Sequence, residues 1–270
     1  MLNVEIIPIK SSKIIEEGDD LLFVLNQSLE DQNVVLEEDD ILVIASKVIS
    51  VVEGRIVSYD TVESSNEAEK LGQKAKIAPE FAQLILDESG GNYIGAVPGA
   101  ITTLNKYGLL ANAGADQSNV GENHAILLPK DCKQSAKELH ESILERYEKY
   151  LGIIIADSRT MPLRLGTVGG ALATYGFKAV LDVRGKEDLF GRPMHITTRA
   201  IADQLATAAE IVMGETDEQV PFALIRGYTI ERIDPSEEED INTLITAEQC
   251  MFIGPLLKCL EEEKGVKKND

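Results

Sequence analysis

The chain has 270 residues, enough for one large domain or two modest ones around a sizeable core. Hydrophobic residues make up 44% and charged residues 27%, as in ordinary globular proteins. The net charge of −20 repels nucleic acid and anionic membrane surfaces, so neither is an expected partner. A phosphate-binding site in such a protein would need divalent cations or a few well-placed Lys and Arg residues.

The amino-terminal residues 1–10 show no basic stretch followed by a long apolar run, which argues against a signal peptide. Apolar segments are far shorter than the roughly 20 residues that cross a bilayer. Cys132, Cys250 and Cys259 lack the close spacing of metal ligands and are typical of reduced thiols. These features predict a soluble, cytoplasmic protein.

In the first half of the chain, strands are expected over 4–9, 41–52 and 104–113, and helices after 18–20, over 64–76 and over 79–86. The segment 41–52 is strongly β-branched and apolar, with a polar interruption at Ser46-Lys47. It predicts a buried strand with that interruption, or two strands across a bulge. Ser64 and Glu67 form a capping box for the helix over 64–76.

In the second half, strands are expected over 125–128, 153–156 and 221–228, and helices from Ser135 to Gly152, from Thr198 to Gly214 and starting at 237–240. Ser135 with Glu138 forms a second capping box. Ile201, Leu205, Ala208 and Val212 form the apolar stripe of the later helix. Strands and helices alternate without a regular βαβ beat, so the expected fold class is α+β, with mixed sheets and packed helices. We expect one domain over 1–254, followed by a helix and tail over 255–270.

Two short polar stretches could carry chemistry. The stretch 112–121 suits a turn on composition alone, but its small residues would also let a ligand approach Asp116 and Asn119. Asp116 could offer a hard oxygen to a metal, and Asn119 an amide to a nucleotide. Asp157-Ser158 ends a buried strand, which is compatible with a turn cap or with Mg²⁺ coordination.

Several further residues have an ordinary and a functional interpretation. The arginines at positions 164, 184, 192 and 226 lie among glycine or apolar residues, and as a group they favour anion binding modestly. Glu215 opens an acidic loop that could simply face solvent. The sequence has no GxxxxGK[ST] loop, GxGxxG turn or GxSxG elbow, which excludes the commonest nucleotide-binding and hydrolase motifs.

Read in order, several segments resemble the coenzyme F420-0:γ-glutamyl ligase family from about Val4 to Tyr228. They are Ile7-Pro8-Ile9; Ser46-Lys47-Val-Ile-Ser50 with Glu53-Gly54-Arg55; Asn112-Ala-Gly with Asp116, Ser118 and Asn119; Asp157-Ser158 with Arg164-x-Gly166; Arg184-Gly-Lys with Asp188-Leu-Phe-Gly191-Arg192; Ala202-Asp203; and Met213-Gly214-Glu215. No single segment is decisive, but their order and spacing together are specific.

The resemblance implies the family's α+β fold, an intertwined homodimer, two Mg²⁺ or Mn²⁺ sites, and GTP or ATP as co-substrate. Asp116 and Asp157 would hold one metal, and Ser158 and Glu215 the second. Asp116, Asp157 and Arg164 would be catalytic. The implied nucleotide contacts are Pro8, Ile9, Ser46, Lys47, Asn119, Met213, Gly214, Glu215, Thr216, Asp217 and Val220.

Two departures from the family pattern stand out. The family has a nucleotide-contacting lysine two residues before Glu-Gly-Arg, and this chain has Val51 there. On a strand, Lys47 would be about 13 Å away and could not replace that charge unless the chain bulges. The family also follows its Asp-Thr with Gly-Arg-Pro, where this chain has the segment 159–164. These differences are typical of a side branch, some members of which are thought to glutamylate folates.

The expected reaction is amide ligation through an acyl phosphate. The acceptor carboxylate attacks the γ-phosphoryl group of the nucleotide, and the glutamate amine then displaces phosphate. The expected acceptor is coenzyme F420-0, with GDP and phosphate released. The alternatives are a tetrahydrofolate γ-glutamyl ligase with the same chemistry and a non-catalytic metal and nucleotide sensor.

Overall fold

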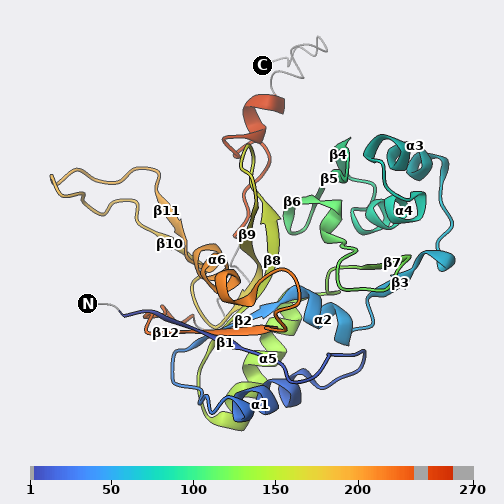
Figure 1. Ribbon diagram of the computed structural model, residues 1–270. Helices are drawn as coiled ribbons and strands as arrows, with labels where there is room; N and C mark the ends of the chain where they lie inside the picture. Colours follow the sequence, from blue (N-terminus) through green and yellow to red (C-terminus); the bar gives the residue numbers. More distant parts are fainter. Residues whose placement is uncertain (1–2, 234–242, 258–270) are drawn as a thin grey trace.

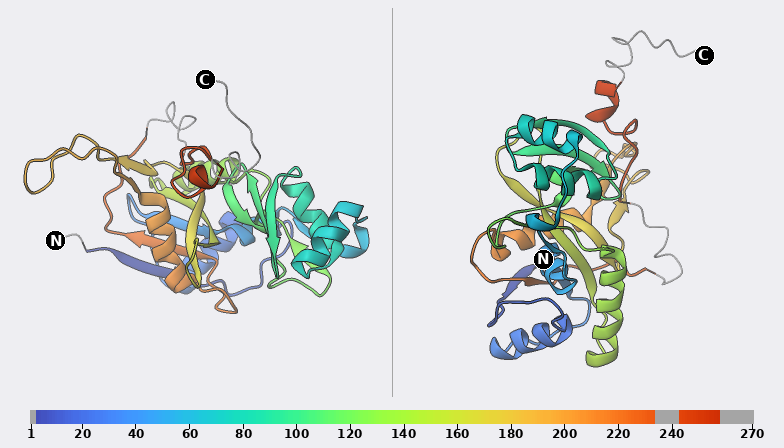
Figure 2. Two further views of the ribbon diagram at one scale, coloured as in Figure 1. Left: turned by 90° about the horizontal axis from the view of Figure 1, so that it is seen from above. Right: turned by 90° about the vertical axis from the view of Figure 1, so that its right-hand side faces the viewer.

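The computed structural model describes residues 3–233 and 243–257 (Figures 1 and 2). Its centre is a five-stranded sheet in the order β1 (Glu5–Ile9), β12 (Phe222–Arg226), β2 (Ile41–Ala45), β8 (Gly152–Thr160) and β9 (Thr167–Tyr175). The pair β2–β8 is parallel and the other neighbours are antiparallel. The sheet is mixed and helices pack on it, which confirms the α+β class.

Helices cover both faces of this sheet. Leu42 and Ile44 pack toward α1 (Leu21–Asp31) and α5 (Cys132–Tyr147), whereas Ile41 and Val43 pack toward α6 (Ile201–Met213). Side chains of a strand alternate between faces, so a run of apolar residues is what a strand buried on both sides requires. Full burial of each such side chain contributes roughly 1.5–3 kcal/mol.

A second lobe packs beside the sheet, on the right in Figure 1. It holds α3 (Asn66–Ala75), α4 (Pro79–Glu88), the sheet β4 (Tyr93–Val97)–β5 (Ala100–Asn105)–β6 (Gly108–Ala111), the pair β3 (Ile56–Ser58)–β7 (His124–Ile126), and the 3₁₀ turns Tyr59–Thr61 and Asn112–Gly114. Its own core includes Phe81, Ile101 and Ala125. The expected strand over 104–113 is thus only partly confirmed: β6 lies within it, but a turn at Lys106 and Tyr107 separates β6 from β5, and Gly108 supplies the left-handed φ of 95°.

The sequence places most elements correctly but misassigns the starts of three helices. Thr198, expected to begin the helix that ends at Gly214, opens strand β11 (Thr198–Ala200), and α6 begins at Ile201. Ser65, rather than Ser64, accepts the hydrogen bond from Ala68 N that starts α3. Asp131 caps α5, which begins three residues before the expected Ser135. In α6 the buried stripe continues through Ala206, Ala209 and Met213 instead of Ala208 and Val212. In each case the sequence pattern correctly predicts a helix, but a residue nearby in the sequence forms the cap or the buried stripe in the folded protein.

The segment 46–52 is the main correction. It is helix α2 (Ser46–Val52), not a continuation of the β2 strand. Ser46, Ile49 and Ser50 are its buried residues, which is the spacing of one helical face. β-branched residues disfavour a helix only weakly, so this packing prevails over their strand preference.

Strands β8 and β9 extend beyond the rest of the sheet. The pairing of β2 with β8 stops at Ala45 and Ala156, where β2 gives way to α2. From Asp157 to Thr160, β8 pairs with β9 alone, and a β-bulge interrupts their register between Ile155 and Ala156. Figure 1 shows this two-stranded ribbon rising away from the sheet.

A long arm lies between β10 (Val180–Asp182) and β11 (Thr198–Ala200), which pair with each other (Figure 1). At the other end of the described chain, residues 253–257 are helical. The rest of the helix and tail expected over 255–270, and the helix start expected at 237–240, lie outside the described residues. Within the described ranges, no helix combines the length and apolar character that a membrane span needs.

Candidate active site at the carboxyl edge of the central sheet

A cleft of about 770 Å³ opens where β2 and β8 separate. We call it the edge cleft. Its walls come from α2, β6, the segment 114–119, the β8–β9 ribbon, α6 and the loop 213–221. The carboxyl ends of parallel strands are a common place for ligands in sheets covered by helices, because the chain diverges there and leaves a crevice.

Most residues that the sequence predicts for the site line this cleft. They are Ser46, Lys47, Asp116, Asn119, Asp157, Ser158, Met213, Gly214, Glu215, Thr216, Asp217 and Val220. Pro8 and Ile9 lie on β1 outside the lining, although residues 13–15 just after that strand reach it. Arg164 is exposed between β8 and β9 and does not line the cleft within this chain.

The other candidate arginines lie elsewhere. Arg226 forms ion pairs with Glu37 and with the buried Asp40, which is a structural role. Arg184 pairs with Asp182 beside its own turn. Arg192 is exposed in the arm between β10 and β11.

Backbone pairing fixes the position of Asp116. Its N–H and C=O form hydrogen bonds with Ile126 at 2.9 and 2.8 Å, and the turn before it contains left-handed residues at Asn112, Ala113 and Gly114. The Asp116 carboxylate accepts hydrogen bonds from Lys47 Nζ at 2.6 Å and from Ser118 Oγ at 2.5 Å. Burial would raise the pKa of Asp116, but these bonds hold it below the usual value.

Asp157 is the most strongly perturbed carboxylate of the cleft. Burial raises its pKa to about 6, and the charge of Asp116 acts in the same direction. A hydrogen bond from Ser46 Oγ at 2.8 Å and the charges of Lys47 and Arg159 oppose the rise. The two aspartates are therefore close enough to repel each other, and a cation between them would relieve that repulsion.

A second carboxylate pair, Glu210 and Glu215, lies on the other face of β8. Ser158 Oγ forms hydrogen bonds with Glu210 at 3.0 Å and Glu215 at 2.5 Å, and Thr167 Oγ1 donates to Glu215 at 3.0 Å. Burial and the hydrogen bond with Glu215 raise the pKa of Glu210 to about 7. Burial opposes the shift at Glu215, yet the bonds from Glu210, Ser158 and Thr167 lower its pKa. Sequence reasoning missed Glu210, whose only signal is a carboxylate beside the buried Ala206 and Ala209 on α6.

These donors suit a hard divalent cation. Carboxylates and hydroxyls are the ligands that Mg²⁺ takes, and each carboxylate pair has one member whose charge is destabilised. The positive charge of Lys47 favours ionisation of Asp116, Asp157 and Glu215, as an ion in the same place would. Among the described residues no three Asp, Glu, His or Cys side chains form a ready-made metal cluster. A cation would therefore share its coordination with substrate oxygens and water.

The loop 213–221 is attached to the second lobe. Asn119 Nδ2 donates to the carbonyl oxygen of Thr216 at 3.0 Å, so two predicted nucleotide contacts from distant segments touch each other. Asn119 adopts a left-handed φ of 57°, a conformation that asparagine tolerates better than most residues. The hydrogen bond thus joins two segments that both line the edge cleft.

The structure overturns the expectation that Lys47 lies too far from position 51 to replace the lysine that the family has there. Both residues line the edge cleft, and in α2 they stand four positions apart on one helical face. That spacing corresponds to a rise of about 6 Å rather than 13 Å. Lys47 therefore can supply positive charge where the strand interpretation ruled it out.

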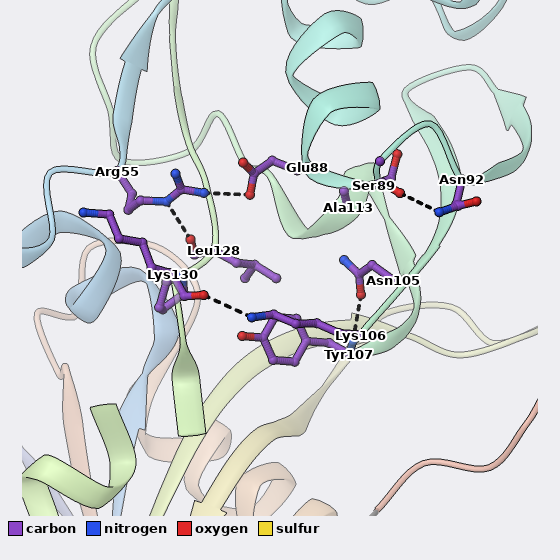
Figure 3. Close-up of a pocket in the computed structure, with 12 residues that line it drawn as sticks. Arg55, Glu88, Ser89, Asn92, Asn105, Lys106, Tyr107, Ala113, Leu128 and Lys130 are labelled. Atoms are coloured by element: carbon purple, nitrogen blue, oxygen red, sulfur yellow. Dashed lines mark hydrogen bonds and ion pairs between the residues drawn. The ribbon is translucent and has the colours of Figure 1, made fainter. Parts of the chain in front are cut away.

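A smaller cavity of about 380 Å³ lies in the second lobe (Figure 3). Its polar residues bind one another: Arg55 donates to Glu88 at 2.7 Å and to the Leu128 carbonyl at 3.0 Å, and Lys106 donates to the Lys130 carbonyl at 3.0 Å. These contacts join α4 to the segments beside it. Their role is structural, and the edge cleft is the candidate active site.

Comparison with known proteins identifies the family of the chain. The profile of the F420-0:Gamma-glutamyl ligase family matches residues 10–227. A coenzyme F420:L-glutamate ligase of Methanothermobacter thermautotrophicus is 34% identical over 228 residues, covering 84% of this chain and 90% of its own. Ligases with the same name from Methanococcus maripaludis and Methanosarcina acetivorans are 42% and 30% identical, covering 72% and 93% of this chain and 78% and 98% of theirs. The chain is therefore a member of the F420-0:γ-glutamyl ligase family.

Proposed function

We propose that this protein is a nucleotide- and divalent-metal-dependent ligase that joins L-glutamate by γ-linkage to coenzyme F420-0. The observation that carries the proposal is the convergence of Asp116, Asp157, Ser158 and Glu215, from separate parts of the chain, on the edge cleft. Membership in the family and the names of the relatives supply the acceptor.

The proposed reaction has two steps. A carboxylate oxygen of the acceptor attacks the γ-phosphorus of the nucleotide, the bond to the diphosphate breaks, and an acyl phosphate forms. The amine of glutamate then attacks the acyl carbon and loses a proton, and inorganic phosphate leaves with the bonding electrons. One amide bond is made for each nucleotide consumed.

The residues of the cleft act through charge and position. Lys47 would neutralise phosphate oxygens, while Asn119 and the loop 213–221 would hold the nucleotide. Asp116, Asp157, Ser158 and Glu215 would hold Mg²⁺ or Mn²⁺, which when bound offsets the charge of the phosphate oxygens. Ser46 positions the Asp157 carboxylate by the hydrogen bond described above.

The experiment offers purified protein either coenzyme F420-0 or tetrahydrofolate, with L-glutamate, Mg²⁺ or Mn²⁺, and GTP or ATP. Mass spectrometry then identifies the product that gains a glutamyl residue. We expect glutamylated F420-0. Glutamylated folate would assign the alternative acceptor, and nucleotide binding without any product would favour a sensor.

We also propose that the protein works as a homodimer. Leu189 and Phe190 at the arm between β10 and β11 are 99% and 84% exposed, and Leu163 and Leu165 between β8 and β9 are fully exposed. Exposed apolar side chains on protruding segments are typical of association surfaces. Light scattering should give twice the chain mass, and Phe190→Asp should shift the equilibrium toward the monomer.

A further inference from the structure

Arg159 follows the proposed metal ligands on β8 and lines the edge cleft. Side chains alternate along a strand, so Arg159 shares the face of Asp157, whereas Ser158 points to the opposite face. On that opposite face Ser158 meets Glu215, which lies in the loop expected to hold the nucleotide. Arg159 is therefore directed away from the nucleotide loop.

Most hydrogen-bond donors of the Arg159 guanidinium have no acceptor among the described residues. Within the described residues it makes one hydrogen bond, from Nη2 to the carbonyl oxygen of Tyr107 at 3.2 Å, and no ion pair within 4.0 Å. Its Nε is buried and has no partner there. An arginine carries five N–H donors, and a buried donor without an acceptor loses its hydrogen bonds to water without replacement. A ligand with suitable oxygens would replace those hydrogen bonds.

The neighbouring strand is shaped to hold this side chain. A Cβ at Gly170 of β9 would lie 2.5 Å from Arg159 Cδ and 2.7 Å from its Nε. Gly170 does not have the left-handed φ that other glycines of the chain adopt. The absence of a Cβ at Gly170 thus leaves the space that the Arg159 side chain occupies, whereas the backbone conformation there does not require glycine.

The surroundings of Arg159 suit a small organic anion. Tyr107, its hydrogen-bond partner, immediately precedes β6, and Leu109, Leu110 and Ala111 of β6 line the same cleft. These β6 residues give Arg159 an apolar neighbour on one side, while Asp157 lies on the same face of β8. In a protein of net charge −20, an anionic substrate needs a counter-charge such as that of Arg159 to stay in the cleft.

We infer that Arg159 is a substrate-binding residue that receives a carboxylate of one of the two carboxylate substrates, the glutamate or the acceptor. A guanidinium can donate two parallel hydrogen bonds to a carboxylate, and Nε with one Nη is one of the two edges that do so. The identity of these substrates rests on the proposed function; the assignment of Arg159 as the carboxylate-binding residue rests on the geometry above.

Steady-state kinetics of Arg159→Met test this role, with Arg146→Met as the control. Arg146 is an exposed arginine on α5, so its loss changes net charge equally. We expect the KM for glutamate or for the acceptor to rise about 10- to 100-fold in Arg159→Met, with the nucleotide KM within about twofold. Whichever carboxylate substrate shows the rise is the ligand. Arg146→Met should match the wild type.

Two further variants separate positioning from folding. Arg159→Lys keeps the charge but loses the paired donors, so it should recover only part of the lost affinity. Gly170→Ala keeps the arginine at position 159, but the added methyl group would displace its side chain. This variant should raise the same KM to a smaller extent than Arg159→Met. An unchanged KM for both carboxylate substrates in Arg159→Met, or a rise confined to the nucleotide, would overturn the inference.

Calorimetric binding distinguishes this inference from the proposed reaction. L-glutamate, coenzyme F420-0 and tetrahydrofolate are each titrated into wild type and Arg159→Met, without turnover. Binding that Arg159→Met loses, with no product formed by the wild type, would keep the role of Arg159 and reject the ligase reaction. If the wild type forms product and Arg159→Met binds all three compounds as the wild type does, with unchanged KM values, the ligase reaction would stand and the role of Arg159 would be rejected.

Discussion

Lys47 Nζ lies 2.6 Å from Asp116 Oδ2. This ion pair inside the edge cleft joins helix α2, which follows strand β2 of the central sheet, to the segment 114–119 beside the second lobe. The same ammonium donates to Ser118 Oγ at 2.7 Å. Lys47 is 31% exposed and lines the cleft, so its ammonium is accessible there. Under the proposed function it would contact a phosphate of the nucleotide, and the ion pair would hold it in position for that contact.

Lys47→Met should therefore weaken nucleotide binding. We expect the nucleotide KM to rise about tenfold or more, because a charge-assisted contact to phosphate is lost. Adding Val51→Lys in the same chain should restore part of the affinity, since position 51 lines the cleft one helical turn away. Lys70→Met, on the exposed side of α3, serves as the charge-matched control. A nucleotide KM unaffected by Lys47→Met would refute this role.

Asp157→Asn should abolish most of the activity. Losing a ligand that positions charge against the phosphoryl group costs several kcal/mol of barrier, so kcat/KM should fall roughly 10²- to 10⁴-fold. Asp31→Asn, at the exposed end of α1, removes an equal charge and should leave turnover unchanged. The two variants are compared at saturating Mg²⁺ and Mn²⁺. Near-normal turnover by Asp157→Asn would contradict the assignment.

The raised pKa of Asp157 also predicts how stability depends on pH. Its pKa is about 6 in the folded protein against an ordinary 3.8, so between those values the folded state binds more protons than the unfolded state. The free energy of unfolding should therefore fall as pH rises from about 4 to 6, by up to roughly 2–3 kcal/mol from this group. Urea unfolding of wild type and Asp157→Asn in EDTA isolates the effect. The stability difference, wild type minus variant, should decrease across that window; an increase would show that the sign is wrong.

Gly169→Ala should destabilise the packing of α6 on β9. A Cβ at position 169 would lie 2.4 Å from the backbone oxygen of Ala206, and backbone cannot move aside as a side chain can. We expect a loss of about 1–3 kcal/mol or more in chemical denaturation. Gly95→Ala is the control, because nothing lies within 4 Å of its Cβ position, and it should change stability by less than about 1 kcal/mol. Equal stability of the two variants would mean that α6 does not pack this closely.

The sequence predicted most elements of the fold, and its resemblance to the ligase family assigned Asp116, Asp157 and Glu215 to one site. Their own sequence pattern, polar residues after a strand or helix end, suits a turn, a cap or a solvent-facing loop at least as well. The structure places all three around the edge cleft. The strand prediction for segment 46–52 is wrong because it rests on the β-branched residues there. The segment is a helix because Ser46, Ile49 and Ser50 are buried on one face, and that burial depends on tertiary contacts.

Arg159 and Glu210 could not be identified from the sequence in the same way. Each looks like an ordinary surface charge on a strand or helix. Their roles depend on the residues that they contact in the folded protein. Arg159 packs against Gly170, and Glu210 interacts with the hydroxyl of Ser158 and the carboxylate of Glu215. The pairings of Arg159 with Gly170 and of Glu210 with Ser158 join residues 11 and 52 positions apart, and a single sequence does not report them.

The β-bulge between Ile155 and Ala156 has a consequence for how this enzyme family can vary. A bulge increases local twist and bends the strand that carries it, and this one lies just before the first proposed metal ligand on β8. The buried sheet thus ends where the two-stranded ribbon begins. Under the proposed function, substitutions of ribbon residues that line the cleft, such as Arg159 and Thr160, would change which acceptor is bound, while the strands before the bulge would keep their packing.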